Sequence, residues 1–162
     1  MYNKILAPLD GSKFSECSLS HVKEIASGCH VGKVVLMTIL KPVFMPGEWW
    51  TTSSKQIEKM NEAIEEQENL AQQNAFNYLT GIGESLKQSG IEVETVVIKD
   101  KDAYEVAETI LKYAEENNID LIVMSTHGRS GPSRWAFGSV ADRVVRHSKT
   151  PVLTVAPSGC RL

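Results

Sequence analysis

Five short apolar runs alternate along this chain with longer segments of helical periodicity, and this alternation restricts the fold more than any other feature of the sequence. The apolar runs, each of strand length, occupy residues 2–9, 33–40, 91–98, 120–125 and 151–155. The helical segments cover about residues 12–28, 57–86, 104–117 and 139–148. Strands that alternate with helices pair in parallel through right-handed crossovers. We therefore expect an α/β fold: a doubly wound, five-stranded parallel sheet with helices on both faces.

The expected sheet is Rossmann-like, with strand order 3-2-1-4-5. Ligands bind to such sheets at the carboxyl ends of the strands, where the strand order reverses. Here the turn from Pro8 to Asp10 would face the segment that follows the fourth strand at Ser125. At this length we expect a single domain over residues 1–157, with a loop insertion at 41–55 and a C-terminal tail at 158–162.

Apolar residues in the helical segments recur at three- and four-residue intervals, which gives each helix one buried face. Leu19, Val22 and Ile25 show this spacing in the first segment. In the longest segment, which spans residues 57–86, Gly81 and Gly83 are expected to weaken the C-terminal end.

The segment from Ser125 to Ser139 has the composition of a phosphate-binding loop. It follows a fully apolar run and leads into a helix at Val140. Glycines let the main chain approach a ligand, and the free N–H groups of a helix start favour an anion. Nine residues separate Gly128 from Gly138, a spacing that fits neither a Walker A loop nor the Gly-x-Gly-x-x-Gly turn. A loop without a ligand remains the alternative.

The charge and hydropathy pattern argues against two classes of partner. The formal net charge is −3 and there is no long basic run, so we expect no nucleic acid. Nowhere do 18 apolar residues occur together, and no basic region followed by a long apolar segment opens the chain. We therefore expect a cytoplasmic protein with no membrane partner.

The cysteines and histidines show no pattern of a metal site or of a nucleophile. Cys17, Cys29 and Cys160 are an odd number without a Cys-x-x-Cys spacing, so we expect free thiols. No serine or cysteine nucleophile with an orienting carboxylate accompanies His127. As an alternative, Asp10 could be a turn residue whose side chain satisfies nearby amides and binds no ligand. We expect no catalytic residue and no dedicated metal site.

Several stretches of the chain resemble the ATP-binding branch of the universal stress protein family. They are Lys4-Ile-Leu-Ala-Pro-Leu-Asp-Gly-Ser12, the end of the second strand at Thr38-Ile39, Asp120-Leu-Ile-Val-Met-Ser-Thr-His-Gly-Arg129, Gly138-Ser-Val140 and Lys149-Thr-Pro-Val-Leu-Thr-Val155. The family signature is Gly-x2-Gly-x9-Gly-Ser/Thr. Here Gly128, Gly138 and Ser139 match it, whereas Ser125 replaces its first glycine.

The resemblance implies a binding site for ATP, with Asp10 near the ribose hydroxyls or near a Mg²⁺ ion bound to the phosphates. The backbone of Ile39 would pair with the adenine edge, and Arg129 would supply charge. The implied nucleotide-binding residues are Pro8, Leu9, Asp10, Ser12, Ile39, Met124, Ser125, Thr126, His127, Gly128, Arg129, Ser130, Gly131, Gly138, Ser139, Val140 and Ala141.

The resemblance also implies a regulatory role in a stress response, in which nucleotide occupancy switches a homodimer. The dimer would form through the last strand, from Pro151 to Val155. An unidentified regulatory protein would be a further partner. Two alternatives stay open: a slow Mg²⁺-dependent ATP hydrolase, and an interaction module without nucleotide.

Overall fold

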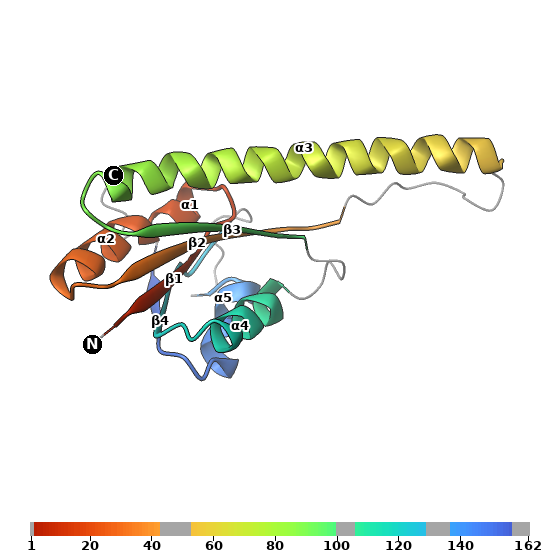
Figure 1. The fold of residues 1–162 in the computed structure, drawn as a ribbon. Helices are drawn as coiled ribbons and strands as arrows, with labels where there is room; N and C mark the ends of the chain where they lie inside the picture. Colours follow the sequence, from red (N-terminus) through yellow and green to blue (C-terminus); the bar gives the residue numbers. More distant parts are fainter. Residues whose placement is uncertain (1, 43–52, 100–105, 129–136, 157–162) are drawn as a thin grey trace.

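A computed structural model of the chain describes residues 2–42, 53–99, 106–128 and 137–156. Figure 1 shows a central sheet with helices on both sides. In chain order the elements are β1 (Lys4–Pro8), α1 (Lys13–Glu16), α2 (Ser18–Gly28), β2 (Lys33–Leu40), α3 (Ser54–Lys87), β3 (Val93–Lys99), α4 (Val106–Glu116), β4 (Leu121–Ser125), α5 (Ser139–His147) and β5 (Val152–Val155). This alternation confirms the predicted fold class.

All strands pair in parallel in the order β3-β2-β1-β4-β5, as predicted. In the central strand β1, Leu6 pairs with Val35 of β2 on one side and with Ile122 of β4 on the other. The strand order therefore reverses beside β1. The turn after β1 and the segment after β4 emerge at the same edge of the sheet.

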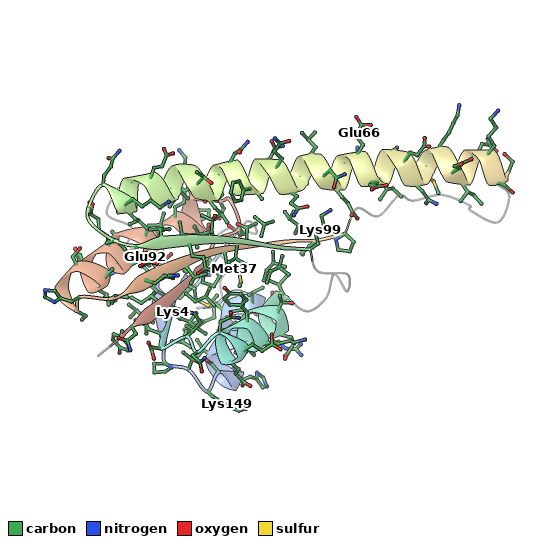
Figure 2. The ribbon with its side chains drawn as sticks, in the orientation of Figure 1. Lys4, Met37, Glu66, Glu92, Lys99 and Lys149 are labelled. Carbon is green, nitrogen blue, oxygen red and sulfur yellow. The ribbon has the colours of Figure 1, made fainter. Side chains whose placement is uncertain are left out.

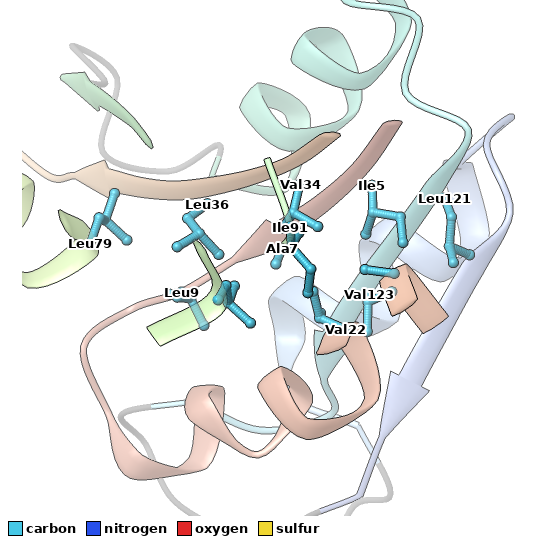
Figure 3. Close-up of a cluster of buried hydrophobic side chains, with 12 residues drawn as sticks. Ile5, Ala7, Leu9, Val22, Val34, Leu36, Leu79, Ile91, Leu121 and Val123 are labelled. Carbon is cyan, nitrogen blue, oxygen red and sulfur yellow. The ribbon is translucent and has the colours of Figure 1, made fainter. Parts of the chain in front are cut away.

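One face of the sheet packs against α2 and α3. Ile5 of β1 and Leu36 of β2 meet Val22 of α2 and Leu79 of α3 in a single apolar cluster (Figure 3). These four side chains are completely shielded from solvent. Burial of one large aliphatic side chain stabilises a fold by about 1.5–3 kcal/mol. This cluster therefore fixes α3 to the sheet.

The opposite face of the sheet packs against α4 and α5. Leu6 of β1 and Met37 of β2 meet Ile110 of α4 and Val144 of α5 in a second apolar cluster. Figure 2 shows Met37 on this side of the sheet. Because successive strand residues point to opposite faces, β1 and β2 must be apolar at almost every position to serve both clusters. Their continuous apolar runs in the sequence have this cause.

The end of α3 lies within one residue of the predicted end. The helix continues through both glycines to Lys87. A Cβ atom on Gly83 would lie 3.2 Å from Cγ1 of Val93, whereas a Cβ atom on Gly81 would meet no atom within 4 Å. The missing side chain of Gly83 therefore lets α3 approach β3 closely, and tertiary packing outweighs the low helix propensity of glycine.

The first predicted helix is divided into α1 and α2 at Cys17. The free-thiol prediction is wrong for Cys17, which is disulfide-bonded, and is confirmed for the exposed Cys29. Cys160 lies outside the described residues, as do the tail 158–162 and most of the loop insertion 41–55. Among the helices that the structure describes, none is long and apolar enough to cross a membrane.

Candidate functional site

The candidate site lies at the carboxyl ends of β1 and β4. β1 ends at Pro8 and β4 ends at Ser125. These strands are neighbours, so residues that follow them are brought together although they lie far apart in the sequence. Arg129, Ser130 and Gly131 fall outside the described residues.

The turn after β1 holds Asp10 in place with its own polar groups. Oδ1 of Asp10 accepts hydrogen bonds from the backbone N–H of Ser12 at 2.9 Å and from its hydroxyl at 2.6 Å. Gly11, with φ at +80°, supplies the left-handed conformation that this turn requires. Ser12 also caps α1, because its Oγ accepts a hydrogen bond from the N–H of Ser15 at 3.2 Å.

This turn is also fixed to the neighbouring strand. The N–H of Leu9 donates to the carbonyl oxygen of Met37 at 2.8 Å. The buried hydroxyl of Thr38 donates to the carbonyl oxygen of Leu9 at 2.9 Å. Thr38 is a site-supporting residue that the sequence reasoning missed, because a threonine at the end of an apolar strand carries no signal of such a role.

Asp10 and Gly128 are in direct contact across the two chain segments. A Cβ atom at position 128 would collide with Oδ2 of Asp10. Only glycine permits this approach of a carboxylate to the backbone. The structure therefore brings together the two residues that sequence reasoning placed opposite each other. It also explains on steric grounds why residue 128 is a glycine.

The segment after β4 is held by backbone and side-chain hydrogen bonds. The N–H of Thr126 donates to the carbonyl oxygen of Val155 at 2.9 Å, and the N–H of Gly138 donates to that of Thr126 at 2.7 Å. Oγ of the buried Ser125 accepts a hydrogen bond from the N–H of His127 at 3.3 Å. The serine that replaces the first signature glycine therefore serves this turn with its own hydroxyl.

His127 is buried, and its Nδ1 lies 2.9 Å from the hydroxyl oxygen of Thr126. Within the described residues no group of three or more histidine, cysteine, aspartate and glutamate side chains could hold a metal ion.

The start of α5 presents backbone N–H groups to the same edge of the sheet. Its N-cap is Gly138, which supplies no side-chain cap. The first N–H groups of a helix have no partner within the helix and carry its positive dipole end. These groups belong to Ser139, Val140 and Ala141. A Cβ atom on Gly138 would lie 3.3 Å from the carbonyl oxygen of Thr126, so this start is tightly packed.

Some predicted site residues can contribute only their backbone. The side chains of Leu9, Met124 and Ala141 are buried in the two apolar clusters. Ile39 pairs with Ile98 of β3 and packs at the margin of the second cluster. Pro8 is half-buried and Ser139 is exposed.

A polar brace from α3, absent from the predictions, supports the turn after β1. The hydroxyl of Tyr78 donates to Oε1 of Glu16 at 2.9 Å. Burial of the phenol, followed by its hydrogen bond to Glu16, raises the pKa of Tyr78 well above its ordinary value. Ser15 completes the connection, since its Oγ accepts a hydrogen bond from the N–H of Asp10 at 3.3 Å.

An open hollow of about 470 Å³ lies elsewhere, between α3 and the outer strand β3. Its lining residues are Asn69, Gln72, Gln73, Phe76 and Val97. None of these lining residues is among the residues of the candidate site.

Comparison with known proteins agrees with this architecture. Residues 1–156 match the universal stress protein family. Universal stress protein MJ0577 of Methanocaldococcus jannaschii is 30% identical over 158 residues, which cover 96% of this chain and 95% of that protein. The solved structure of MJ0577 superposes with a TM-score of 0.75 at 29% identity and covers 96% of both chains.

Two more distant structures share the fold. A universal stress protein in complex with cAMP has a TM-score of 0.61 at 22% identity and covers 96% of this chain and 98% of that one. The Arabidopsis thaliana family member At3g01520 with AMP bound has a TM-score of 0.56 at 13% identity and covers 95% and 91%. From the extent of the sequence match and from this fold, the chain belongs to the universal stress protein family.

Proposed function

We propose that this chain binds ATP between the carboxyl ends of β1 and β4 and acts as a cytoplasmic, nucleotide-dependent regulatory homodimer. The observation that carries the proposal is the contact of Gly128 with Asp10, beside an α5 start whose cap is Gly138. The two glycines let the segments after β1 and β4 pack closely at this edge of the sheet, and the helix start supplies N–H donors and a favourable dipole for a phosphate chain.

The choice of an adenine nucleotide rests on the family. Two structural relatives were solved with cAMP and with AMP, which share an adenine, a ribose and a phosphate. In this chain the backbone of Ile39 at the end of β2 would pair with the adenine edge, and the carboxylate of Asp10 would receive the ribose hydroxyls. Ser139 to Ala141 would hold the phosphates.

A Mg²⁺ ion would enter with the triphosphate. Asp10 is the carboxylate that the turn after β1 offers, and one carboxylate suffices for Mg²⁺ when phosphates and waters complete its octahedral shell. With no catalytic base assigned in the described residues, the proposed role is binding. Phosphate release with ATP and Mg²⁺ would distinguish a slow hydrolase.

The proposed dimer uses the edge strand β5. Pro151 and Val155 accept hydrogen bonds from β4 through their carbonyl oxygens. The N–H and carbonyl groups of Val152 and Thr154 therefore point outward, where an antiparallel β5 of a second copy could pair with them.

The side chains of Leu153 and Val155 face the protein's own core, so substitutions there would also disturb the fold, and Thr154→Pro is the sharper test of the dimer. It removes an outward N–H group, and Thr154→Val is its matched control. Sedimentation should show monomers for Thr154→Pro and dimers for the control.

The binding test combines mass spectrometry of the denatured protein, which reveals co-purified nucleotide, with calorimetry. We expect a dissociation constant for ATP in the micromolar range, or about −8 kcal/mol. Gly138→Val should abolish binding while circular dichroism shows a folded chain. Gly81→Val, at an exposed glycine with no neighbouring atoms, is the control. No heat at millimolar ATP, or unchanged affinity in folded Gly138→Val, would contradict the proposal.

A further inference from the structure

A series of hydrogen bonds connects α3 to the turn that carries Asp10. The hydroxyl of Tyr78 donates to Oε1 of Glu16 at 2.9 Å, and Glu16 is the last residue of α1. One residue earlier, Oγ of Ser15 accepts a hydrogen bond from the N–H of Asp10 at 3.3 Å and donates to the carbonyl oxygen of Ser12 at 2.8 Å. Figure 1 shows α1 beside the second half of α3. The brace from Tyr78 therefore reaches the candidate site through α1.

The helix between them, α1, depends on support from its surroundings. It has four residues, of which Ser15 is buried. A single helical turn is not stable by itself, because nucleation is costly. A buried serine adds little apolar area. The position of α1 therefore depends on polar contacts, and the hydrogen bond from Tyr78 to Glu16 is one of them.

Tyr78 itself stands on a fixed part of α3. Its neighbour Leu79 is completely shielded from solvent, and Tyr78 packs against the same apolar cluster. Packing that locks a side chain also fixes the polar group at its end. The sheet and α3 therefore form a rigid frame from which the phenol hydroxyl holds the last residue of α1.

The carboxylate of Asp10 also lies close enough to act on the phenol through its charge. Burial, followed by the hydrogen bond to Glu16, raises the pKa of Tyr78, and the negative charge of Asp10 adds to this rise. Charge interactions weaken with distance. The brace and the carboxylate therefore belong to one local network.

The orientation of Asp10 determines how well its carboxylate can receive a sugar. Oδ1 accepts two hydrogen bonds from Ser12, whereas Oδ2 faces the backbone of Gly128. Hydrogen bonds to a carboxylate are strong only at short distance and good alignment. A shift of α1 would move Ser12 and Ser15, and the carboxylate would move with them.

We propose that Tyr78 is a positioning residue for ribose recognition, which holds Asp10 through Glu16 and α1 in the orientation that receives the ribose hydroxyls. This inference rests on the proposed ATP site. The brace acts on the β1 side of that site, so phosphate binding at the start of α5 does not depend on it.

Calorimetry with ATP and with 2′,3′-dideoxy-ATP, each with Mg²⁺, tests this role as a ratio of two dissociation constants. Because hydrogen bonds to a charged group are the stronger ones, the parent should bind ATP about 30-fold more tightly than dideoxy-ATP. In Tyr78→Phe the ratio should fall to about tenfold, because only ATP loses affinity. A merely structural role of Tyr78 would leave the ratio unchanged.

Variants at two further positions separate the brace from general effects. Glu16→Ala should lower the ratio as Tyr78→Phe does, and the two changes together should lower it no further. Glu16→Gln keeps an oxygen acceptor for the phenol and should retain the parent ratio. Ile82→Val, one turn along α3 and packed against the same cluster, is the matched control. It weakens the fold through lost packing and should also retain the parent ratio.

The outcomes distinguish this inference from the proposed function. An unchanged ratio in Tyr78→Phe, or an equal fall in Ile82→Val, would overturn the positioning role and leave the ATP site standing. A parent that binds ATP and dideoxy-ATP equally would overturn it as well, because Asp10 would then not receive the ribose. A parent that binds neither nucleotide would contradict the proposed function, and the inference with it.

Discussion

The two sides of the candidate site are built on opposite principles. On the β1 side, Asp10, Ser12 and Ser15 satisfy one another's backbone groups through side-chain hydrogen bonds. On the β4 side, α5 starts at Gly138 without a side-chain cap. The hydrogen-bonded turn after β1 fixes the position of the Asp10 carboxylate, whereas the uncapped start of α5 offers backbone N–H groups as hydrogen-bond donors. An anion should therefore bind to the β4 side and be oriented by the β1 side.

The contact between the two sides is the first place to break this arrangement. Gly128→Ala puts a methyl group where the Asp10 carboxylate lies, and Oδ1 of that carboxylate is held by two hydrogen bonds to Ser12. We expect ATP affinity to fall by roughly 100-fold, or about 2.7 kcal/mol, and unfolding free energy to fall by about 1–2 kcal/mol. Calorimetry and urea denaturation measure both.

The control for this variant is Gly28→Ala, at a glycine whose added Cβ would meet no atom within 4 Å. It should leave affinity and stability within the error of the parent. If Gly128→Ala bound ATP as tightly as this control, the contact with Asp10 would have no part in the site.

A charge at the open helix start sharpens the comparison. Ser139→Asp places a carboxylate in the first turn of α5, where the helix dipole favours it by about 0.3–1 kcal/mol. The same carboxylate repels phosphate, so ATP affinity should fall by roughly 30-fold, or about 2 kcal/mol. Higher stability with weaker binding is the signature of an unoccupied anion position, and Ser139→Asn is the neutral control. A stability loss in Ser139→Asp would show that the N–H groups are already satisfied.

On the β1 side, a substitution should lower stability more than it lowers ATP affinity. Ser12→Ala removes the cap of α1 and a partner of Asp10, so the free energy of unfolding should fall by about 1–2 kcal/mol. ATP affinity should fall only about threefold, because the helix start on the other side is untouched. Ser20→Ala, at an exposed serine of α2, is the control. A larger loss of affinity than for Ser139→Asp would reverse the assignment of the two sides.

Most of the fold, and the meeting of the segments after β1 and β4 at the candidate site, followed from the sequence for identifiable physical reasons. Strand-helix alternation and the handedness of crossovers indicate a doubly wound parallel sheet, and the order β3-β2-β1-β4-β5 brings Asp10 beside Gly128. The spacing from Gly128 to Gly138 marked the side of the candidate site that we propose binds an anion. These are rules of chain topology and backbone geometry, which depend little on how particular side chains pack.

Features that depend on packing between distant elements were missed. Period-two alternation in β5 shows that Leu153 and Val155 share a face, but not that this face meets the core. The brace from Tyr78 depends on the rotation of α3 about its axis, which the whole apolar cluster determines.

This brace gives the smallest expected effect. Tyr78→Phe removes the hydrogen bond to Glu16 and should lower the free energy of unfolding by about 1 kcal/mol at pH 7. Because the pKa of Tyr78 is raised in the folded protein above its ordinary value of 10.0, the unfolded chain loses this proton first. The stabilising contribution is therefore complete below pH 10 and is lost as the pH rises further.

Urea denaturation between pH 8 and pH 11 should show the parent losing its advantage over Tyr78→Phe above about pH 10. Burial also raises the pKa of Tyr113. Because Tyr113 is present in the parent and in the variant, its contribution cancels in the difference between them. A constant difference across this range would show that Tyr78 titrates alike in the folded and unfolded chains, and the brace would then be exposed to water.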